Sequence, residues 1–514
     1  MEDGAFPLGT TAYEKRGIAP TIPEWQIDNC IQCGQCSYVC PHATVRLFLL
    51  DEEEQKRAPE SYRTKAALGK NLGAYQLRVQ ISPLDCTGCG NCAQICPAKE
   101  KALVMKPAEP QIEAEKDHWE FSMTLREKSN LANRFTVKGS QLIRPLMEFN
   151  GACPGCGETP YIRLLTQLFG ERMMIANATG CSSIWGASAP SIPYTTNASG
   201  RGPAWANSLF EDNAEFGYGM FLGAGQIRER LKGLAREATA DESLGGEIRS
   251  ALKNWLDANE DAASQENSEE IRRLLALSEN SDQPLLQRVS ELSDYLDKRS
   301  YWFIGGDGWA YDIGYGGLDH VLSTGADVNL FVMDTEVYSN TGGQASKSTP
   351  VGAVAKFAFD GKATNKKNLG LMAATYGNVY VAQIAMGADF NQTIRAMKEA
   401  ESYPGPSLLI AYAPCINHGI QTGMATSIME EKEAVEAGYW HLYRYYPRLK
   451  GQGQNPFQLD SKEPSGSYQE FLRGEIRYSQ LENTFPEIAK KLFDQSEQFA
   501  KERFKMYQAM KNGK

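Results

Sequence analysis

With 514 residues, the chain is longer than one hydrophobic core normally supports, so we expect two or three domains. Hydrophobic residues make up 42% and charged residues 23% of the chain, which is an ordinary globular composition. The formal charge is −10, from 53 basic and 63 acidic residues, and it argues against nucleic acid or an anionic membrane as the main partner.

No stretch approaches the roughly 18 to 20 uninterrupted apolar residues of a membrane span. Residues 1–17 lack the basic region followed by an apolar region that marks a secretory signal. We therefore expect a cytoplasmic protein. In a reducing compartment the twelve cysteines are expected to be metal ligands or redox groups rather than disulfides.

Two cysteine runs with the same spacing come first along the chain, Cys30–Pro41 and Cys86–Pro97. Each reads C-x2-C-x2-C-x3-C-P, the ligand pattern of a two-cluster ferredoxin. Three cysteines at spacing three wrap one iron–sulfur cube, and the fourth, before proline, serves the other cube. A pair of zinc sites, the alternative, would need separate C-x2-C pairs. The two predicted [4Fe–4S] ligand sets are Cys30, Cys33, Cys36 and Cys96, and Cys86, Cys89, Cys92 and Cys40.

These runs predict a small ferredoxin-like domain over residues 1–110 with little regular structure, in which the charged segment 51–60 is a solvated insertion. A linker over residues 111–150 follows. Residues 151–440 are predicted to form an α/β domain with a buried parallel sheet, because the candidate strands are apolar on both faces. The expected strands are 172–177, 301–306, 328–334, 378–385 and 407–413. Helical spacing predicts an antiparallel helical insertion at about 225–300 and a C-terminal helical tail at 441–514.

A Gly-Asp-Gly sequence, residues 306–308, ends one expected strand, and "DTEVYSNTGG" (334–343) ends another. Neighbouring parallel strands end at the same sheet edge, so Asp307 should face Thr335, Val337 and Asn340. A carboxylate, a hydroxyl and a carbonyl suit Mg²⁺ bound to a diphosphate. Gly-Asp-Gly alone is a common turn, but the pair of motifs predicts a thiamine diphosphate site. Glycines 305, 306 and 308 should keep the backbone clear of the phosphates. Asp334 and Glu336 could equally be solvated loop acids.

Four cysteines remain: Cys153, Cys156, Cys181 and Cys415. Only the C-x2-C pair is informative by spacing, and Cys181 and Cys415 could be small buried hydrophobic residues. Glycine or proline beside each, and the position of two at strand ends, indicate a third cluster next to the thiamine site. His418 could be a ligand or a base, and a structural loop histidine is the alternative.

These motifs, together with "CPGCGET", "TGCSS" and "PCINHG", resemble the C-terminal part of pyruvate:ferredoxin (flavodoxin) oxidoreductase. The resemblance implies oxidative decarboxylation of pyruvate to acetyl-CoA and CO2. Electrons would pass through three [4Fe–4S] clusters to ferredoxin or flavodoxin, with thiamine diphosphate, Mg²⁺ and coenzyme A taking part. It also implies a homo-oligomer.

The resemblance also assigns residues. Cys153, Cys156, Cys181 and Cys415 match the ligands of the proximal cluster, and Asp307, Thr335 and the Val337 carbonyl match the Mg²⁺ ligands. Asn340 matches a catalytic position near the reactive carbon. The matching cofactor contacts are Glu158, Cys181, Gly306, Asp307, Gly308, Trp309, Thr335, Glu336, Val337, Tyr338, Ser339 and Asn340.

Single-chain members of this family are much longer than 514 residues, and their N-terminal domains supply groups that this chain lacks. We therefore expect a portion that is catalytically silent without the N-terminal domains or a partner subunit. Two alternatives stay open at this point. One is the same chemistry on another 2-oxo acid, and the other is an electron-transfer module without its own catalysis.

Overall fold

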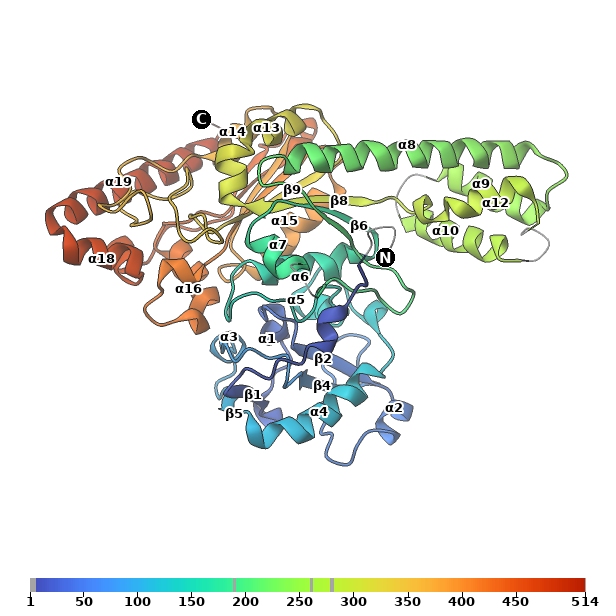
Figure 1. Cartoon of the computed structure of the whole chain (residues 1–514), viewed down its shortest axis with the longest axis horizontal. Helices are drawn as coiled ribbons and strands as arrows, with labels where there is room; N and C mark the ends of the chain where they lie inside the picture. The colour runs from blue at the N-terminus through green and yellow to red at the C-terminus, as the bar shows by residue number, and fades with distance from the viewer. Residues whose placement is uncertain (1–5, 188–190, 259–261, 278–281, 514) are drawn as a thin grey trace.

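The computed structural model describes residues 6–187, 191–258, 262–277 and 282–513. Residues 1–5, part of the N-terminal stretch used above, therefore lie outside the described residues. A cysteine-rich N-terminal region lies below a large central sheet, and a helical arm extends from the side of that sheet (Figure 1). Within the described residues, no helix has the length and apolar character that crossing a bilayer requires.

The central sheet has eight strands in the order β13-β12-β10-β11-β9-β8-β6-β7. The strands from β10 to β7 all run parallel, whereas β12 and β13 are antiparallel. Every residue of β9 and β11 is buried, which explains why these strands are apolar on both faces. The bounds are β6 Met173–Asn177, β7 Ala204–Asn207, β8 Ser300–Gly306, β9 Asn329–Asp334, β10 Tyr380–Ile384, β11 Ser407–Tyr412, β12 Tyr443–Tyr445 and β13 Phe457–Leu459.

Helices cover both faces of this sheet, and each face has its own hydrophobic core. One core packs Phe303, Leu330 and Ile410 against one layer of helices; the other packs Trp302, Phe331 and Leu409 against the opposite layer. The α/β fold class is confirmed. The first layer includes α13 Tyr315–Ser323 and α14 Leu369–Ala374; the second includes α6 Thr159–Phe169, α7 Cys181–Ala187 and α15 Phe390–Ser402, while α16 Ser427–Glu436 reaches both.

The helical arm lies between β7 and β8 in the chain and has a separate core of leucine, isoleucine and tryptophan side chains. Its long helix α8 starts at Asn213, before the expected 225, and its first turns pack on β8. The arm is formed by α8 Asn213–Ala240, α9 Gly246–Asp257, α10 Ala262–Leu275 and α12 Pro284–Glu291, and beyond the first turns of α8 it projects away from the sheet in Figure 1.

The N-terminal region is more regular than expected, because it contains two small sheets. Strand β1 pairs with β5, and β2, β4 and β3 form a three-stranded sheet. The segment 51–60, expected to be solvated, starts with a helix capped by Asp51, and Glu54 is buried against Lys128. The bounds are β1 Thr21–Trp25, α1 Gln35–Tyr38, β2 Val45–Leu50, α2 Glu52–Lys56, β3 Lys65–Ala66, β4 Gln76–Ile81, α3 Asn91–Gln94, β5 Leu103–Pro107, α4 Glu109–Met123 and α5 Val137–Ser140.

The segment 441–514, expected to be a helical tail, begins with two strands of the central sheet, β12 and β13. These two strands were not predicted because each has only three residues, too few to show alternation. Their aromatic side chains Tyr443 and Phe457 stack on one face. The helices that follow are α17 Tyr468–Arg473, α18 Ile476–Thr484 and α19 Pro486–Lys511.

Candidate functional site

The two motifs at the sheet edge meet because β8 and β9 are parallel neighbours. Gly306 pairs in register with Met333, so the next residues of both strands leave the sheet side by side. The Thr335 hydroxyl lies 3.0 Å from the Asp307 carboxylate, although the two residues are 28 positions apart. The expected convergence of these motifs at one edge is therefore what the fold produces.

Three oxygens surround the Thr335 hydroxyl. Its Oγ1 lies 3.0 Å from Asp307 Oδ1, 2.9 Å from the Val337 carbonyl and 2.7 Å from Ser339 Oγ. A hydroxyl carries one proton, so it can donate to only one of these neighbours at a time. A divalent cation would satisfy such a group of oxygens, and carboxylate, hydroxyl and carbonyl oxygens are the ligands that Mg²⁺ takes. The residues present therefore fit a magnesium ion.

Asp307 is buried, and its surroundings call for a positive charge. Burial raises the pKa of Asp307 well above its usual value, and the nearby Asp334 raises this pKa further. Hydrogen bonds from Ser346 and Thr335 to the carboxylate act in the opposite direction but do not offset burial. A bound cation would supply the charge that keeps this carboxylate ionised.

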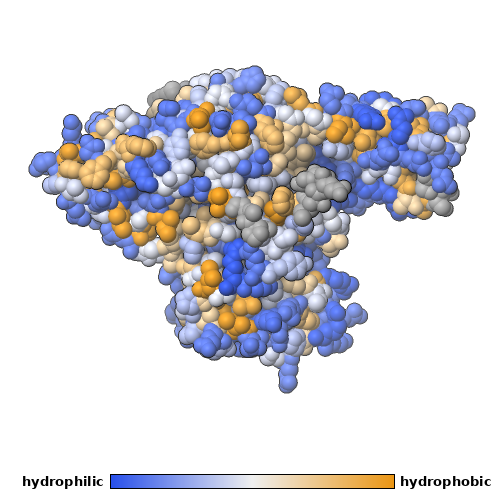
Figure 2. All heavy atoms as spheres, in the orientation of Figure 1, coloured by the Kyte–Doolittle hydropathy of each residue, from blue (hydrophilic) through white to orange (hydrophobic). Residues whose placement is uncertain are grey.

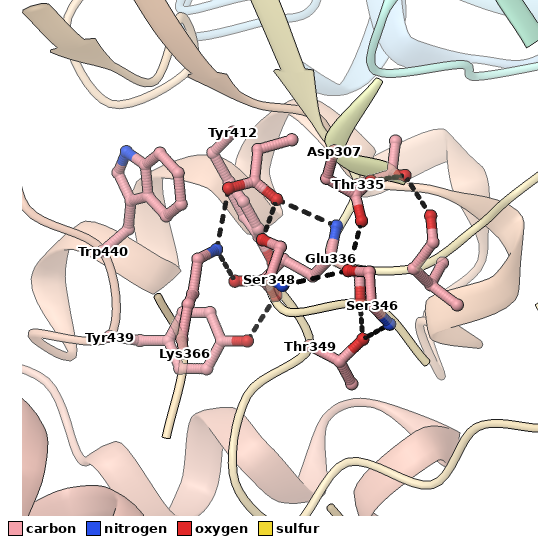
Figure 3. Close-up of polar contacts among 12 residues, drawn as sticks. Asp307, Thr335, Glu336, Ser346, Ser348, Thr349, Lys366, Tyr412, Tyr439 and Trp440 are labelled. Atoms are coloured by element: carbon pink, nitrogen blue, oxygen red, sulfur yellow. Dashed lines mark hydrogen bonds and ion pairs between the residues drawn. The ribbon is translucent and has the colours of Figure 1, made fainter. Parts of the chain in front are cut away.

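Asp334 and Glu336 are not solvated loop acids, which corrects that alternative. Both are fully buried, and Lys366 lies between them, 2.9 Å from Asp334 Oδ2 and 2.8 Å from Glu336 Oε1 (Figure 3). Burial alone would raise the pKa of Glu336, but Lys366, Arg477 and His418 outweigh it and lower this pKa to about 2. Glu336 is thus a buried anion held by a cluster of cationic side chains.

The glycines of the first motif have different roles. A Cβ atom on Gly305 would lie 2.5 Å from the Trp309 ring, and one on Gly308 would lie 2.6 Å from the Tyr338 ring. These two glycines allow aromatic packing, whereas the nearest atom to a Cβ on Gly306 would be 3.9 Å away. Only Gly306 has the open space on its side that a phosphate group would need.

The other expected cofactor contacts lie around this edge. Tyr338 and Ser339 are half-buried on the loop after β9, and Asn340 is exposed beyond them. Trp309 is buried in the first core, and its indole nitrogen has no hydrogen-bond partner. Glu158 is buried and accepts a hydrogen bond from Trp185 Nε1 at 2.8 Å, and burial raises the pKa of Glu158 to about 7.

The first cysteine set is gathered across the N-terminal region. Burial raises the pKa of Cys33 and of Cys36, and the charges of Cys30 and Cys96 raise both further, so all four thiols are within electrostatic range. The Ala102 amide points at the Cys96 sulfur at 3.3 Å. Cys96 thus lies with the cysteines of the run Cys30–Cys36 and not with those of its own run, Cys86–Cys92.

The second set is gathered in the same way, since Cys40, Cys86, Cys89 and Cys92 line one cavity. Burial raises the pKa of Cys86 to about 12 and of Cys89 to about 11, with contributions from Cys40. The last cysteine of each run therefore lies with the first three cysteines of the other run. A cubane cluster fits this grouping, because each of its four irons would bind one deprotonated thiol.

The remaining four cysteines also lie together. Burial raises the pKa of Cys181, and among the further causes are Cys415, Cys156 and Cys153. Backbone amides point at two of these sulfurs, from Glu158 to Cys156 at 3.4 Å and from Asn417 to Cys415 at 3.5 Å. In the described part of the chain, no three His, Cys, Asp or Glu side chains are placed to hold a single metal ion.

Comparison with known proteins agrees with this inventory. Residues 24–100 match the family described as a 4Fe-4S dicluster domain, and residues 292–411 match the C-terminal TPP-binding domain of thiamine pyrophosphate enzymes. The chain is 57% identical to a pyruvate-flavodoxin oxidoreductase of Enterobacter agglomerans, covering 99% of this chain and 44% of the relative. The resemblance to the pyruvate:ferredoxin (flavodoxin) oxidoreductases is confirmed.

Two further relatives extend the comparison. The pyruvate:ferredoxin oxidoreductase of Moorella thermoacetica is 56% identical over 99% of this chain and 44% of its own length. A mitochondrial pyruvate dehydrogenase of Euglena gracilis, named for NADP+, is 50% identical over 99% of this chain and 28% of its own length. The chain thus spans less than half the length of these pyruvate oxidoreductases.

Several polar residues at the candidate site were not found from the sequence. Ser346 and Ser348 hydrogen-bond Asp307 and Asp334, and Lys366 and Arg477 bind Glu336. Arg477 is 141 positions from Glu336, and no local pattern marks either cation. His418, left open above, is buried, with Nε2 2.7 Å from the Thr335 carbonyl.

Proposed function

We propose that this chain is the thiamine- and cluster-bearing portion of a pyruvate:ferredoxin (flavodoxin) oxidoreductase. Together with the missing domains or a partner subunit, it would convert pyruvate and coenzyme A to acetyl-CoA and CO2 and pass electrons to ferredoxin or flavodoxin. One observation carries this proposal: the oxygen cluster at Thr335 and the cysteine group containing Cys415 are adjacent. Asn417 Nδ2 lies 3.4 Å from the Ser339 carbonyl, beside that cluster.

Three groups of ligands follow from the proposal. Asp307, Thr335 and the Val337 carbonyl would hold Mg²⁺ and through it the cofactor diphosphate, over the open side of Gly306. Three [4Fe–4S] clusters would be held by Cys30, Cys33, Cys36 and Cys96, by Cys40, Cys86, Cys89 and Cys92, and by Cys153, Cys156, Cys181 and Cys415. The remaining cofactor contacts would be Glu158, Gly308, Trp309, Glu336, Tyr338, Ser339 and Asn340.

When bound, thiamine diphosphate supplies a carbon nucleophile and stabilises the negative charge left by decarboxylation. The chain's own contribution is positioning. The Thr335 loop fixes the oxygens that would orient the diphosphate, and the buried first core under Trp309 excludes water from that side. Asn340 is exposed at the loop end and would contact a ligand that approaches from outside. Backbone amides aimed at Cys156 and Cys415 would tune the nearest cluster.

The proposed organisation is a ferredoxin-like domain over 1–110, a linker over 111–150 and a thiamine diphosphate domain over 151–440, and the segment 441–514 adds β12 and β13 to the sheet of that domain before its own helices. A homo-oligomer remains part of the proposal. A cytoplasmic location also remains part of it, because a reducing compartment keeps cysteine ligands from pairing as disulfides. The relatives are named for flavodoxin, ferredoxin and NADP+, so the choice of acceptor needs a direct assay.

The test is anaerobic. The purified chain, reconstituted with iron and sulfide, should bind thiamine diphosphate with Mg²⁺ yet reduce no ferredoxin or flavodoxin from pyruvate by itself. Adding the remaining portion of a relative's polypeptide should restore pyruvate- and coenzyme A-dependent reduction. Absence of thiamine diphosphate binding would instead favour an electron-transfer module, and a preference for another 2-oxo acid in the restored assay would change the substrate.

A further inference from the structure

A short C-terminal segment, Glu475–Arg477, lies at the start of α18 and is inserted between two loops of the candidate site. The Glu475 side chain is completely buried and that of Arg477 is 5% exposed, and the two are joined by a 2.6 Å ion pair. Neither residue is near the site in the sequence. Burying an ion pair costs desolvation free energy, so this pair need not stabilise the fold. The groups that Arg477 and Glu475 bind therefore indicate its role better.

Arg477 reaches the loop after β9. One guanidinium nitrogen lies 2.8 Å from Glu336 Oε2 and 3.1 Å from the Tyr439 hydroxyl. Glu336 has a φ of +59°, the left-handed region that side chains other than glycine rarely adopt. Its neighbours on either side, Thr335 and Val337, supply two of the three proposed Mg²⁺ ligands. Holding Glu336 in this conformation is therefore what brings the two oxygens together.

Glu475 reaches the loop after β11, which carries Cys415. Its Oε1 lies 3.4 Å from His418 Nδ1, while His418 Nε2 contacts the Thr335 carbonyl at 2.7 Å. The Ile476 amide also donates to the Gly419 carbonyl at 2.8 Å. A Cβ on Gly419 would lie 2.6 Å from the Ile476 side chain, so the loop and the segment are in close contact.

We propose that Glu475 and Arg477 are positioning residues that hold the proposed Mg²⁺–diphosphate loop and the Cys415 loop in fixed relation to each other. This inference rests on the proposed function, and it assigns a role to the C-terminal segment in cofactor binding. Neither residue needs to touch the cofactor. Their effect would pass through Glu336 on one side and through His418 on the other.

The experiment measures binding of thiamine diphosphate and Mn²⁺ by the full reconstituted chain, using tryptophan fluorescence for the first ligand and electron paramagnetic resonance for the second. Arg477→Met should weaken both affinities by about 10- to 100-fold, the range typical for residues that orient metal ligands. Arg477→Lys, which keeps the charge but cannot reach Glu336, Tyr439 and Glu475 at once, should lie between wild type and Arg477→Met.

Arg473→Met is the matched control. Arg473 lies four residues earlier, is 48% exposed and pairs with Glu482 on the surface, so both affinities should stay at wild-type values. Glu475→Gln should lose about four irons per chain to a mild chelator before wild type does, because the Cys415 loop is released. Circular dichroism checks that Arg477→Met is folded. If Arg477→Met does not fold, the comparison is made with Arg477→Lys.

The outcomes separate the two proposals. If wild-type chain binds neither ligand, the proposed function is overturned. If wild type binds both ligands and the two Arg477 variants bind them as tightly as wild type, the positioning role is overturned. It is also overturned if Arg473→Met loses as much affinity as Arg477→Met.

Discussion

At the scale of single residues, the candidate site combines features that the sequence displays with features that only the fold creates. Asp307 and Thr335 could be predicted together because each directly follows an apolar strand. Lys366 and Arg477 could not, because lysine and arginine on polar stretches are indistinguishable from surface residues until the chain is folded. The same reasoning left open a solvated position for Glu336, which is instead buried between two cations.

Asp307→Ala tests the cation site. Removing the carboxylate leaves only a hydroxyl and a carbonyl from the protein, so the affinity for thiamine diphosphate with Mg²⁺ should fall by about 100-fold, or roughly 2.7 kcal/mol. Titration of the reconstituted chain measures this loss. Asp327→Ala, at the opposite end of β9 and paired with Lys298, should bind as wild type does. Equal loss in both variants would contradict the assignment of Asp307.

At the scale of elements, the parallel strands were predictable and the antiparallel additions were not. Buried parallel strands show long apolar runs, and the expected runs coincide with β6, β8, β9, β10 and β11 within two residues at each end. Strands β12 and β13 join the sheet through only three residues each. Their pairing depends on side chains distant in sequence, of which Arg444 is the clearest example.

Arg444 holds β12 to two other elements. Its guanidinium binds Glu399 of α15 at 2.7 Å and Asp460, just after β13, at 2.9 Å. Arg444→Met should lower the free energy of unfolding by about 3–5 kcal/mol, because two largely buried carboxylates lose their partner. Urea unfolding followed by circular dichroism measures the loss. Arg273→Met removes an exposed helical pair with Glu270 and should change stability little.

The long helix α8 packs on β8 through a glycine. A Cβ on Gly217 would lie 2.4 Å from the Phe303 ring, whereas one on Gly219 would meet no atom within 4 Å. Gly217→Ala should therefore lower the free energy of unfolding by about 1–3 kcal/mol through overpacking. Gly219→Ala should raise it by about 0.5–1 kcal/mol, since alanine favours the helix. Thermal unfolding of the two variants should show shifts of opposite sign, and equal shifts would contradict this packing.

We expect Glu431 to make the protein's stability depend on pH. Burial raises its pKa to about 8, although Gly387 and Tyr161 donate hydrogen bonds to its carboxylate. The folded state holds this proton while the unfolded state, near the usual pKa of about 4.5, releases it. The resulting stability is complete below pH 4.5 and is lost as pH rises toward 8. Glu431→Gln should flatten the decline in melting temperature between pH 6 and 8, and an unchanged decline would exclude this residue as its source.

At the scale of the whole molecule, the sequence predicted a sheet domain and a cysteine-rich domain, but not how they meet. The N-terminal region contacts the sheet domain through long-range hydrogen bonds, such as the bond from the Arg163 guanidinium to the Tyr38 carbonyl. Buried polar contacts of this kind leave no periodic signal. Because the cysteine groups lie in both the N-terminal region and the sheet domain, the iron content of the chain reports on both.

Iron content should report all three cysteine groups. The reconstituted chain should hold about twelve irons, and Cys415→Ala should hold about eight, because only the group with Cys153, Cys156 and Cys181 loses a ligand. Cys96→Ala should disturb the group with Cys30 and spare the group with Cys86. Iron and acid-labile sulfide assays measure both. An intact count of twelve in Cys415→Ala would remove that cysteine from the set.

The exchanged last cysteines of the two N-terminal runs have a consequence for how this chain could be divided or evolve. Cys40 lies with the later run and Cys96 with the earlier one, so each half borrows a thiol from the other. A gene split between the runs would leave two fragments, neither of which could complete its own inorganic core. Neither run can therefore supply four thiolates to one cluster without a cysteine of the other run.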